Sequence, residues 1–321
     1  MILRIEAQWP TCMPSEAVTQ VRRCLMIPDR AGDRITLLRL LTILHNGRPE
    51  PAVQFDDQTV ALGGAGFQSV LSIIAGGEDA QDGLMRWVER HPGSADIDLA
   101  TVGYLSPIPR PPKIICIGLN YRDHAEESKL PIPEVPTVFC KFPTAVTGHG
   151  HPVVLPKAST KPDYEAEFAV VIGPGGRHIA EQDWRKHVFG YTILNDVSAR
   201  DYQMATSQWM IGKTFDTFAP IGPAVVTADE IEDPHNLNIS LTLSGEVMQS
   251  SNTRNLIFRI PQLIAHLSSV FTLEPGDIIA TGTPAGVGFA RKPPRWLRPG
   301  DDMVTKIEGL GELHNPIVAE V

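Results

Sequence analysis

The chain lacks several features that would assign it to common classes of protein. No apolar run reaches the roughly 18 residues of a membrane-spanning helix. Its four cysteines form no CxxC pair, which argues against a zinc ribbon or a disulfide framework. It has no block of Lys and Arg, and 37 acidic against 28 basic residues give a net charge of -9, which disfavours a nucleic-acid partner. The sequence therefore predicts a protein that binds small molecules and has neither a membrane nor a nucleic acid as a partner.

The N-terminal segment also lacks targeting features. It mixes basic and acidic residues, without the apolar centre of a signal peptide or the acid-poor character of a transit peptide. A cytoplasmic location is expected on this ground, and a mitochondrial one is left open.

The composition that is present is typical of a globular protein. Hydrophobic residues make up 42% of the 321 residues and charged residues 20%, enough for one large domain or two. The proline-rich stretch LSPIPRPPK, residues 105–113, is incompatible with the inside of a helix or a central strand and is predicted to mark a boundary. We expect a small N-terminal α+β region over residues 1–105 and a second unit over residues 106–321.

Within the first region, residues 35–45 (ITLLRLLTILH) have a helical appearance, and the rest of residues 1–50 gives no clear pattern. Two further helices are predicted over residues 67–77 and 82–91. Residues 106–321 instead carry β-branched runs bounded by Gly and Pro: 114–118, 168–173, 191–196, 219–226, 238–245, 276–284 and 303–309. With short helices predicted only around 122–127 and 256–269, the fold class is α+β and mainly β.

Carboxylates collect where two of these runs begin or end. In DYEAEFAVVIG, Glu165 and Glu167 point to the same side of a strand because strand side chains alternate. Asp196 ends the run GYTILND and could complete a set of three. Three oxygen ligands without His or Cys favour Mg²⁺ or Mn²⁺ over zinc. The alternatives are a solvated strand face for the glutamates and a turn-forming role for Asp196.

A second candidate group lies in IGLNYRDHAEES, residues 117–128. His124 and Glu127 are three residues apart, so on a helical turn the carboxylate can bind one ring nitrogen and leave the other as a base. Such pairs also occur on solvated helices without any catalytic role.

Five blocks in this order, IGLNYRDHAEE, DYEAEFAVVIG, GYTILNDVSARDYQ, GKTFDTFAPIGP and GDIIATGTPAGVG, resemble the signature of the fumarylacetoacetate hydrolase family over residues 106–321. The resemblance implies a mixed β-sandwich roll with short helices, assembled as a homodimer. It also implies a divalent metal, Mg²⁺ or Mn²⁺ with Ca²⁺ as a further candidate, and chemistry at carbon-carbon bonds beside a 2-oxo acid or 1,3-diketone.

The resemblance also assigns roles to residues that match the family's motifs. It implies metal ligands at Glu165, Glu167 and Asp196, and catalytic groups at His124, Glu127 and Lys213. It implies substrate contacts at Arg200, Gln203, Lys213 and Thr283.

Two departures from the family pattern concern substrate choice. Asn120 occupies the position where fumarylacetoacetate hydrolase itself has a further metal aspartate, as in the acylpyruvase and oxaloacetate decarboxylase-like branch that handles smaller oxo acids. His149 and His151 stand where a Pro and an acidic residue are expected.

These observations favour, first, metal-dependent hydrolysis of a carbon-carbon bond of an acylpyruvate-type 2-oxo acid or 1,3-diketone through a metal-bound enolate. His124 with Glu127 would activate the water, and Lys213 would stabilise the enolate. The alternatives are a decarboxylase or a keto-enol tautomerase or isomerase acting on oxaloacetate-like 2-oxo acids, because both need the same enolate. A non-catalytic, metal-dependent oxo-acid binding protein is the alternative from another class.

Overall fold

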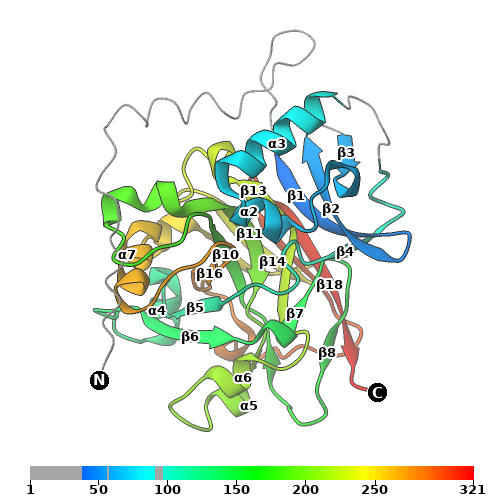
Figure 1. Ribbon diagram of the computed structural model, residues 1–321. Coiled ribbons are helices and arrows are strands. Elements are labelled where there is room, and N and C mark those ends of the chain that lie inside the picture. The colour runs from blue at the N-terminus through cyan, green and yellow to red at the C-terminus, as the bar shows by residue number, and fades with distance from the viewer. Residues whose placement is uncertain (1–37, 56–57, 91–96) are drawn as a thin grey trace, which may run out of the picture.

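The structure, a computed structural model, describes residues 38–55, 58–90 and 97–321, and β-sheets dominate it (Figure 1). The larger sheet is mixed, with β4 (Gly103–Leu105) beside β1 and β7 (Val146–Thr147) beside β13. Its main path, in spatial order, runs through β3 (Gln58–Ala61), β2 (Arg48–Phe55), β1 (Arg39–His45), β13 (Ala219–Thr227), β11 (Val188–Asn195), β10 (Ala166–Ile172), β16 (Ile278–Ala280), β5 (Ile114–Gly118) and β6 (Thr137–Lys141).

A second sheet packs against the first. Its spatial order is β15 (Glu246–Asn252), β14 (Asn238–Leu243), β17 (Asp302–Ile307), β18 (Gly311–Ala319) and β8 (Val153–Leu155). A short ribbon pairs β9 (Pro162–Asp163) with β12 (Ser198–Ala199). The main hydrophobic core contains buried side chains of both large sheets, among them Phe168, Tyr191, Leu241 and Leu313.

The helices are short and lie outside the sheets (Figure 1). The α-helices are α2 (Val70–Ala75), α3 (Gly77–Arg90), α4 (Arg122–Ser128), α5 (Arg200–Gln203), α6 (Met210–Lys213) and α7 (Ile260–Val270). The 3₁₀ turns are η1 (Gly63–Ala65), η2 (Pro143–Ala145), η3 (Glu181–His187), η4 (Ala228–Glu230), η5 (Thr253–Asn255) and η6 (Gly288–Ala290). The predicted mainly β fold with short helices is confirmed, and each predicted β run coincides with a strand.

The prediction of a helix over residues 35–45 is wrong for the part of this range that the structure describes. Residues 39–45 form β1, which pairs with β2 along its length and with β13 at Arg39 and Leu40. Leu40, Leu41 and Ile43 are all buried, so the strand is covered on both faces. A strand of this kind is apolar throughout, and periodicity cannot separate it from a buried helix.

The N-terminal region contributes strands to the large sheet, and α2 and α3 pack over β1–β3 in a second core with Leu40, Val53 and Val60 (Figure 1). The helices predicted over residues 67–77 and 82–91 are present as α2 and α3, while His91 lies outside the described residues. The division of the chain at residue 105 stays a prediction.

The directions of the strands bring four chain segments together at one end of the strands of the large sheet. β10 is antiparallel to both β11 and β16, and β16 is parallel to β5. The start of β10 therefore lies beside the ends of β11, β16 and β5. The carboxylates, the Thr283 loop and α4 all follow or precede these strand ends, so the topology assembles them in one place.

The edge of the large sheet leads to a prediction about assembly. Among the described strands β6 pairs with β5 alone, and Val135, Val138 and Phe142 in and around it are exposed. An apolar sheet edge is a surface that proteins cover. We expect a homodimer, and light scattering at micromolar concentration should give a mass near twice the 35.1 kDa of one chain. A mass of one chain under these conditions would contradict the prediction.

Candidate metal centre and active site

Three carboxylates form the centre of the site. Oxygen atoms of Glu165, Glu167 and Asp196 lie within 4.8 Å of one another, and all three residues are buried. The register of β10 and β11 produces this arrangement, because Ala166 pairs with Asn195 and the Asp196 N–H donates to the Glu165 carbonyl oxygen at 2.8 Å. The structure thus brings together the three residues that the sequence predicts as metal ligands.

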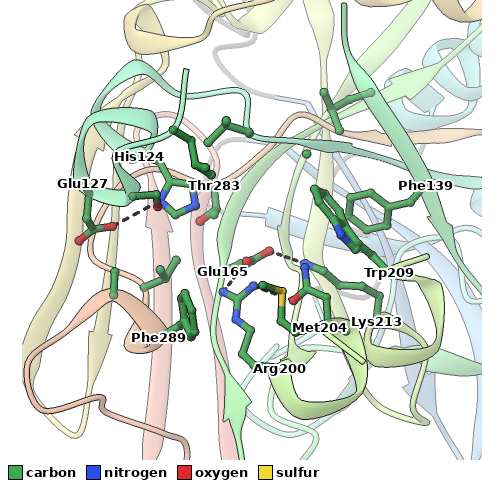
Figure 2. Close-up of a pocket in the computed structure, with 18 of the residues that line it drawn as sticks. His124, Glu127, Phe139, Glu165, Arg200, Met204, Trp209, Lys213, Thr283 and Phe289 are labelled. Atoms are coloured by element: carbon green, nitrogen blue, oxygen red, sulfur yellow. Dashed lines mark hydrogen bonds and ion pairs between the residues drawn. The ribbon is translucent and has the colours of Figure 1, made fainter. Parts of the chain in front are cut away.

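Three buried cations surround the carboxylates. Lys213 Nζ lies 2.6 Å from Glu165 Oε2 and 2.8 Å from Asp196 Oδ2. Arg200 donates to Glu165 Oε1 at 2.6 Å, and Lys141 Nζ donates to Asp196 Oδ1 at 2.5 Å. Glu165 and Asp196 are therefore each paired with a cation, and no ion pair within the described part of the chain includes Glu167. Figure 2 marks the ion pairs of Glu165 with Arg200 and Lys213.

The pKa values of the two glutamates move apart. Burial opposes ionisation of Glu165, but the charges of Arg200 and Lys213 outweigh it and lower its pKa to about 2. Burial and the neighbouring charges of Asp196 and Glu165 raise the pKa of Glu167 well above its usual value. The hydrogen bond from the Gly282 N–H to Glu167 Oε2, 2.8 Å long, only partly offsets this.

This distribution of charge fits a divalent cation. Four buried carboxylates, those of the triad and Asp163, meet the three buried cations Lys141, Arg200 and Lys213, so negative charge is in excess. Without metal, a proton on Glu167 removes the excess. A divalent ion would stabilise all three ionised carboxylates instead, and an all-oxygen ligand set is the one that Mg²⁺ and Mn²⁺ prefer.

The second predicted group lies at the rim of the same cavity. His124 and Glu127 are on α4, and His124 Nδ1 is 3.3 Å from Glu127 Oε2. Burial opposes ionisation of Glu127, but hydrogen bonds from His124 and from the Gly286 N–H outweigh it and hold the pKa of Glu127 below its usual value. An ionised carboxylate only accepts, so in the neutral imidazole Nδ1 is the nitrogen that carries the proton and Nε2 the one with the lone pair.

A cavity of about 420 Å³ connects the two groups. Arg200, Gln203, Lys213 and Thr283 all line it, together with His124, Glu127, Glu165 and Glu167. Its other walls are apolar and include Phe139, Met204, Trp209 and Phe289 (Figure 2). The structure therefore places every predicted substrate-contacting residue on one cavity wall or floor.

The residues that depart from the family pattern have local structural roles. Asn120 is buried; its amide donates to the carbonyl oxygens of Phe258 at 3.0 Å and Thr281 at 2.7 Å, and its Oδ1 accepts from the Phe258 N–H at 2.7 Å. These bonds use both amide hydrogens and hold the side chain between two loops, and the described carboxylate group consists of Glu165, Glu167 and Asp196. The His149 ring packs at a tilt against the Tyr104 ring, with the ring centroids 5.0 Å apart, and His151 lines a separate cavity of about 140 Å³.

Sequence reasoning missed two charged residues of the site. The first is Lys141, which ends the run TVFC and is followed by Phe142, so the available signal was a lysine within an apolar strand. Asp163 accepts from Arg200 Nε at 2.9 Å and from the Gly288 and Phe289 N–H groups at 2.8 and 3.0 Å. It orients the arginine toward Glu165, and its position two residues before Glu165 was the available signal.

The fold and the carboxylate site together define a metal-dependent enzyme. Residues 113–318 match the sequence profile Fumarylacetoacetate (FAA) hydrolase C-terminal. The bovine oxaloacetate tautomerase FAHD2A, mitochondrial, is 50% identical over 219 residues, which cover 68% of this chain and 70% of the relative. The chain belongs to the fumarylacetoacetate hydrolase family.

Solved structures agree with this assignment. The fumarylacetoacetate hydrolase of Exiguobacterium antarcticum gives a TM-score of 0.76 at 33% identity, over 88% of this chain and 100% of that one. The maleylpyruvate hydrolase of Sphingobium sp. SYK-6, solved with manganese(II) and pyruvate, gives 0.74 at 33% identity over the same shares. These likenesses extend over most of the chain, well beyond the profile match. Among the described residues, no helix is long and apolar enough to span a membrane.

The triad yields a prediction about metal binding. Glu167→Gln keeps the shape of the side chain and an oxygen for the Gly282 N–H but removes the charge that faces the ion. We expect the Mn²⁺ affinity to fall by more than roughly 100-fold, since losses at outer-shell partners of metal sites already reach that size. Calorimetric titration of the metal-stripped protein measures the affinity. Glu127→Gln is the matched control, because Glu127 lies outside the triad, and its affinity should equal that of the wild type. Unchanged binding by Glu167→Gln would contradict the assignment.

Proposed function

We propose that the chain catalyses keto-enol tautomerisation of a small 2-oxo dicarboxylic acid of the oxaloacetate type. The observation that carries this proposal is the position of the His124–Glu127 pair at the rim of a cavity that is also lined by Glu165 and Glu167, two of three carboxylates that lie within 4.8 Å of one another. A proton carrier and a metal centre on one cavity are the two components that enolisation needs. The name of the bovine relative at 50% identity supports the same reaction.

Glu165, Glu167 and Asp196 would hold Mg²⁺ or Mn²⁺. When bound, the ion would be chelated by the 2-oxo acid and would polarise the carbonyl group of that acid. Manganese in the maleylpyruvate hydrolase structure supports an ion of this kind. With the ion present, the buried charges become net positive, which favours an anionic substrate.

The proton transfer is assigned to His124. Glu127 fixes the proton on Nδ1, so Nε2 can accept a proton from C3 of the substrate. The electron pair of the C3–H bond then forms the C2=C3 bond, and the carbonyl oxygen becomes the enolate oxygen. Return of the proton to that oxygen gives the enol. Glu127 stabilises the imidazolium between the two transfers.

The cationic floor of the cavity serves the negative charges of the substrate. We assign Lys213 to the developing enolate oxygen, since its Nζ already lies between Glu165 and Asp196. Arg200 and Gln203 interact with each other at 2.9 Å and line the same wall, where they can contact a substrate carboxylate. Thr283 offers a hydroxyl group from the opposite side (Figure 2).

Hydrolysis of an acylpyruvate, which the sequence favours first, is the second candidate. The maleylpyruvate hydrolase named above covers 88% of the chain. A cavity of about 420 Å³ with apolar walls also has room for an acyl group beyond the 2-oxo acid. We rank tautomerisation first, and the higher identity to an oxaloacetate tautomerase, 50% against 33%, supports this order. The name of that tautomerase also includes the word mitochondrial, which supports the mitochondrial location for this chain.

A substrate panel separates these reactions. The Mn²⁺-loaded protein is mixed with enol-oxaloacetate and with acylpyruvates, and ultraviolet loss of the enol, CO₂ release and acid products are measured in the same samples. We expect enol loss above the buffer rate without CO₂ or cleavage products from oxaloacetate. Stoichiometric CO₂ would identify a decarboxylase instead, and acid products from acylpyruvates a hydrolase. Chelator-treated protein is the control.

The role of the base gives a further prediction. His124→Ala should lower kcat by roughly 10² to 10⁴, the usual range for a lost general base, with Mn²⁺ affinity retained. Glu127→Gln should cost less, because a glutamine still accepts from Nδ1 but does not stabilise the imidazolium. Steady-state kinetics with parallel calorimetry measures both effects. Loss of the metal in His124→Ala, or wild-type turnover, would show that His124 is not the base.

A further inference from the structure

Gln249 connects the second sheet to the active site without lining the cavity. It lies on β15 and is 1% exposed. Its Oε1 accepts from the Ala166 N–H at 2.9 Å, and its Nε2 donates to the Pro284 carbonyl oxygen at 2.9 Å and to Thr283 Oγ1 at 2.8 Å. One buried amide thus contacts the residue between two metal-ligand candidates and the loop that carries Thr283.

The orientation of this amide is fixed by chemistry. The Ala166 N–H can only donate, so it requires the oxygen of the Gln249 amide. The Pro284 carbonyl can only accept, so it requires the nitrogen. The two backbone groups therefore exclude the flipped amide, in which a donor would face a donor and an acceptor an acceptor.

The fixed amide determines which way the Thr283 hydroxyl group points. Because Nε2 is a donor, Thr283 Oγ1 must accept from it, and the hydroxyl proton is left for another partner. No hydrogen bond among the described residues uses that proton. Thr283 is 5% exposed and lines the cavity with Glu165 and Lys213. The free proton is therefore available to a ligand in the cavity.

We propose that Gln249 is a positioning residue that makes Thr283 a hydrogen-bond donor to the bound substrate. The acceptor is an anionic oxygen of a 2-oxo acid, in keeping with the substrate class under the proposed function on which this inference rests. A hydroxyl group bonded to a carboxylate or an amide oxygen would instead turn its proton away from the cavity. Gln249 thus acts through Thr283 and has no contact with the substrate.

The experiment uses pyruvate binding to the Mn²⁺-loaded protein, which needs no turnover and so remains informative if the tautomerase assignment fails. Gln249→Met has a similar length and no donor. We expect its pyruvate affinity to fall about 10-fold, the size of one lost hydrogen bond to a charged group, with Mn²⁺ affinity unchanged. Equal losses of pyruvate and Mn²⁺ affinity would show a merely structural role and overturn the proposal.

A double-mutant cycle tests whether the effect passes through the hydroxyl group. Thr283→Val removes it and should lower pyruvate affinity to the same degree, while Thr283→Ser should keep wild-type affinity. In the Thr283→Val background, Gln249→Met should have no further effect. If the loss of pyruvate affinity in the double variant equals the product of the two single losses within about twofold, the two residues act independently and the proposal is contradicted.

A second variant covers the case in which Gln249→Met does not fold. Gln249→Glu keeps an acceptor for the Ala166 N–H and lacks the amide donor, so we expect a loss of pyruvate affinity in the same direction. Thermal unfolding reports the folded state of each variant. Retention of full affinity by folded Gln249→Glu would contradict the proposal, as would a wild-type Mn²⁺-loaded protein that does not bind pyruvate.

Discussion

The burial of four carboxylates with three cations is the constraint on which the arrangement of the site depends. Removing charges from water costs several kcal/mol for each ion, and only close pairing offsets the cost. The pairs of Asp196 with Lys141 and Lys213, and of Glu165 with Arg200 and Lys213, provide that compensation. Within the part of the chain that the structure describes, Glu167 forms no ion pair, and burial with the charges of Asp196 and Glu165 raises its pKa. The unbalanced carboxylate indicates where an additional positive charge belongs.

Both sheets contribute to holding the cluster of carboxylates in place. The large sheet supplies the carboxylates through the β10–β11 register, and the second sheet fixes the backbone around them. Asn195 accepts from the Glu165 N–H at 3.0 Å and donates to Thr305 Oγ1 on β17 at 3.2 Å. Gln249 on β15 fixes the Ala166 N–H in the same way. Polar side chains at the interface between the sheets therefore hold the backbone on each side of Glu165.

Local rules of sequence predicted the parts of the site that lie close together in the chain. Alternation along a strand placed Glu165 and Glu167 on one side, and the i, i+3 spacing paired His124 with Glu127. Lys141 and Gln249 were not predicted because their partners are 55 and 83 residues away in the sequence. Only the topology of the sheets brings such residues into contact. The same limit explains β1, where Leu40 and Ile43 fit a helix or a doubly covered strand equally well. The seven β runs predicted within residues 106–321 were recognisable because Gly or Pro bounds them, whereas β6, β15 and β18 were not predicted.

The His124–Glu127 pair and the carboxylate triad are held in place by different kinds of contact. The triad is enclosed by buried ion pairs, whereas α4 is held at the rim by polar contacts: Asp123 accepts from Ser251, Arg122 donates to the Leu256 carbonyl oxygen, and the Gly286 N–H bonds Glu127. The side chains of His124 and Glu127 are 15% and 25% exposed. Tautomerisation, decarboxylation and hydrolysis share an enolate, and a rigid ion centre serves all three. In tautomerisation the base removes a proton from carbon, in hydrolysis it removes one from water, and in decarboxylation it removes none. Under the proposed function, the residues around α4 would therefore determine the reaction, and the buried triad would determine only that an enolate can form.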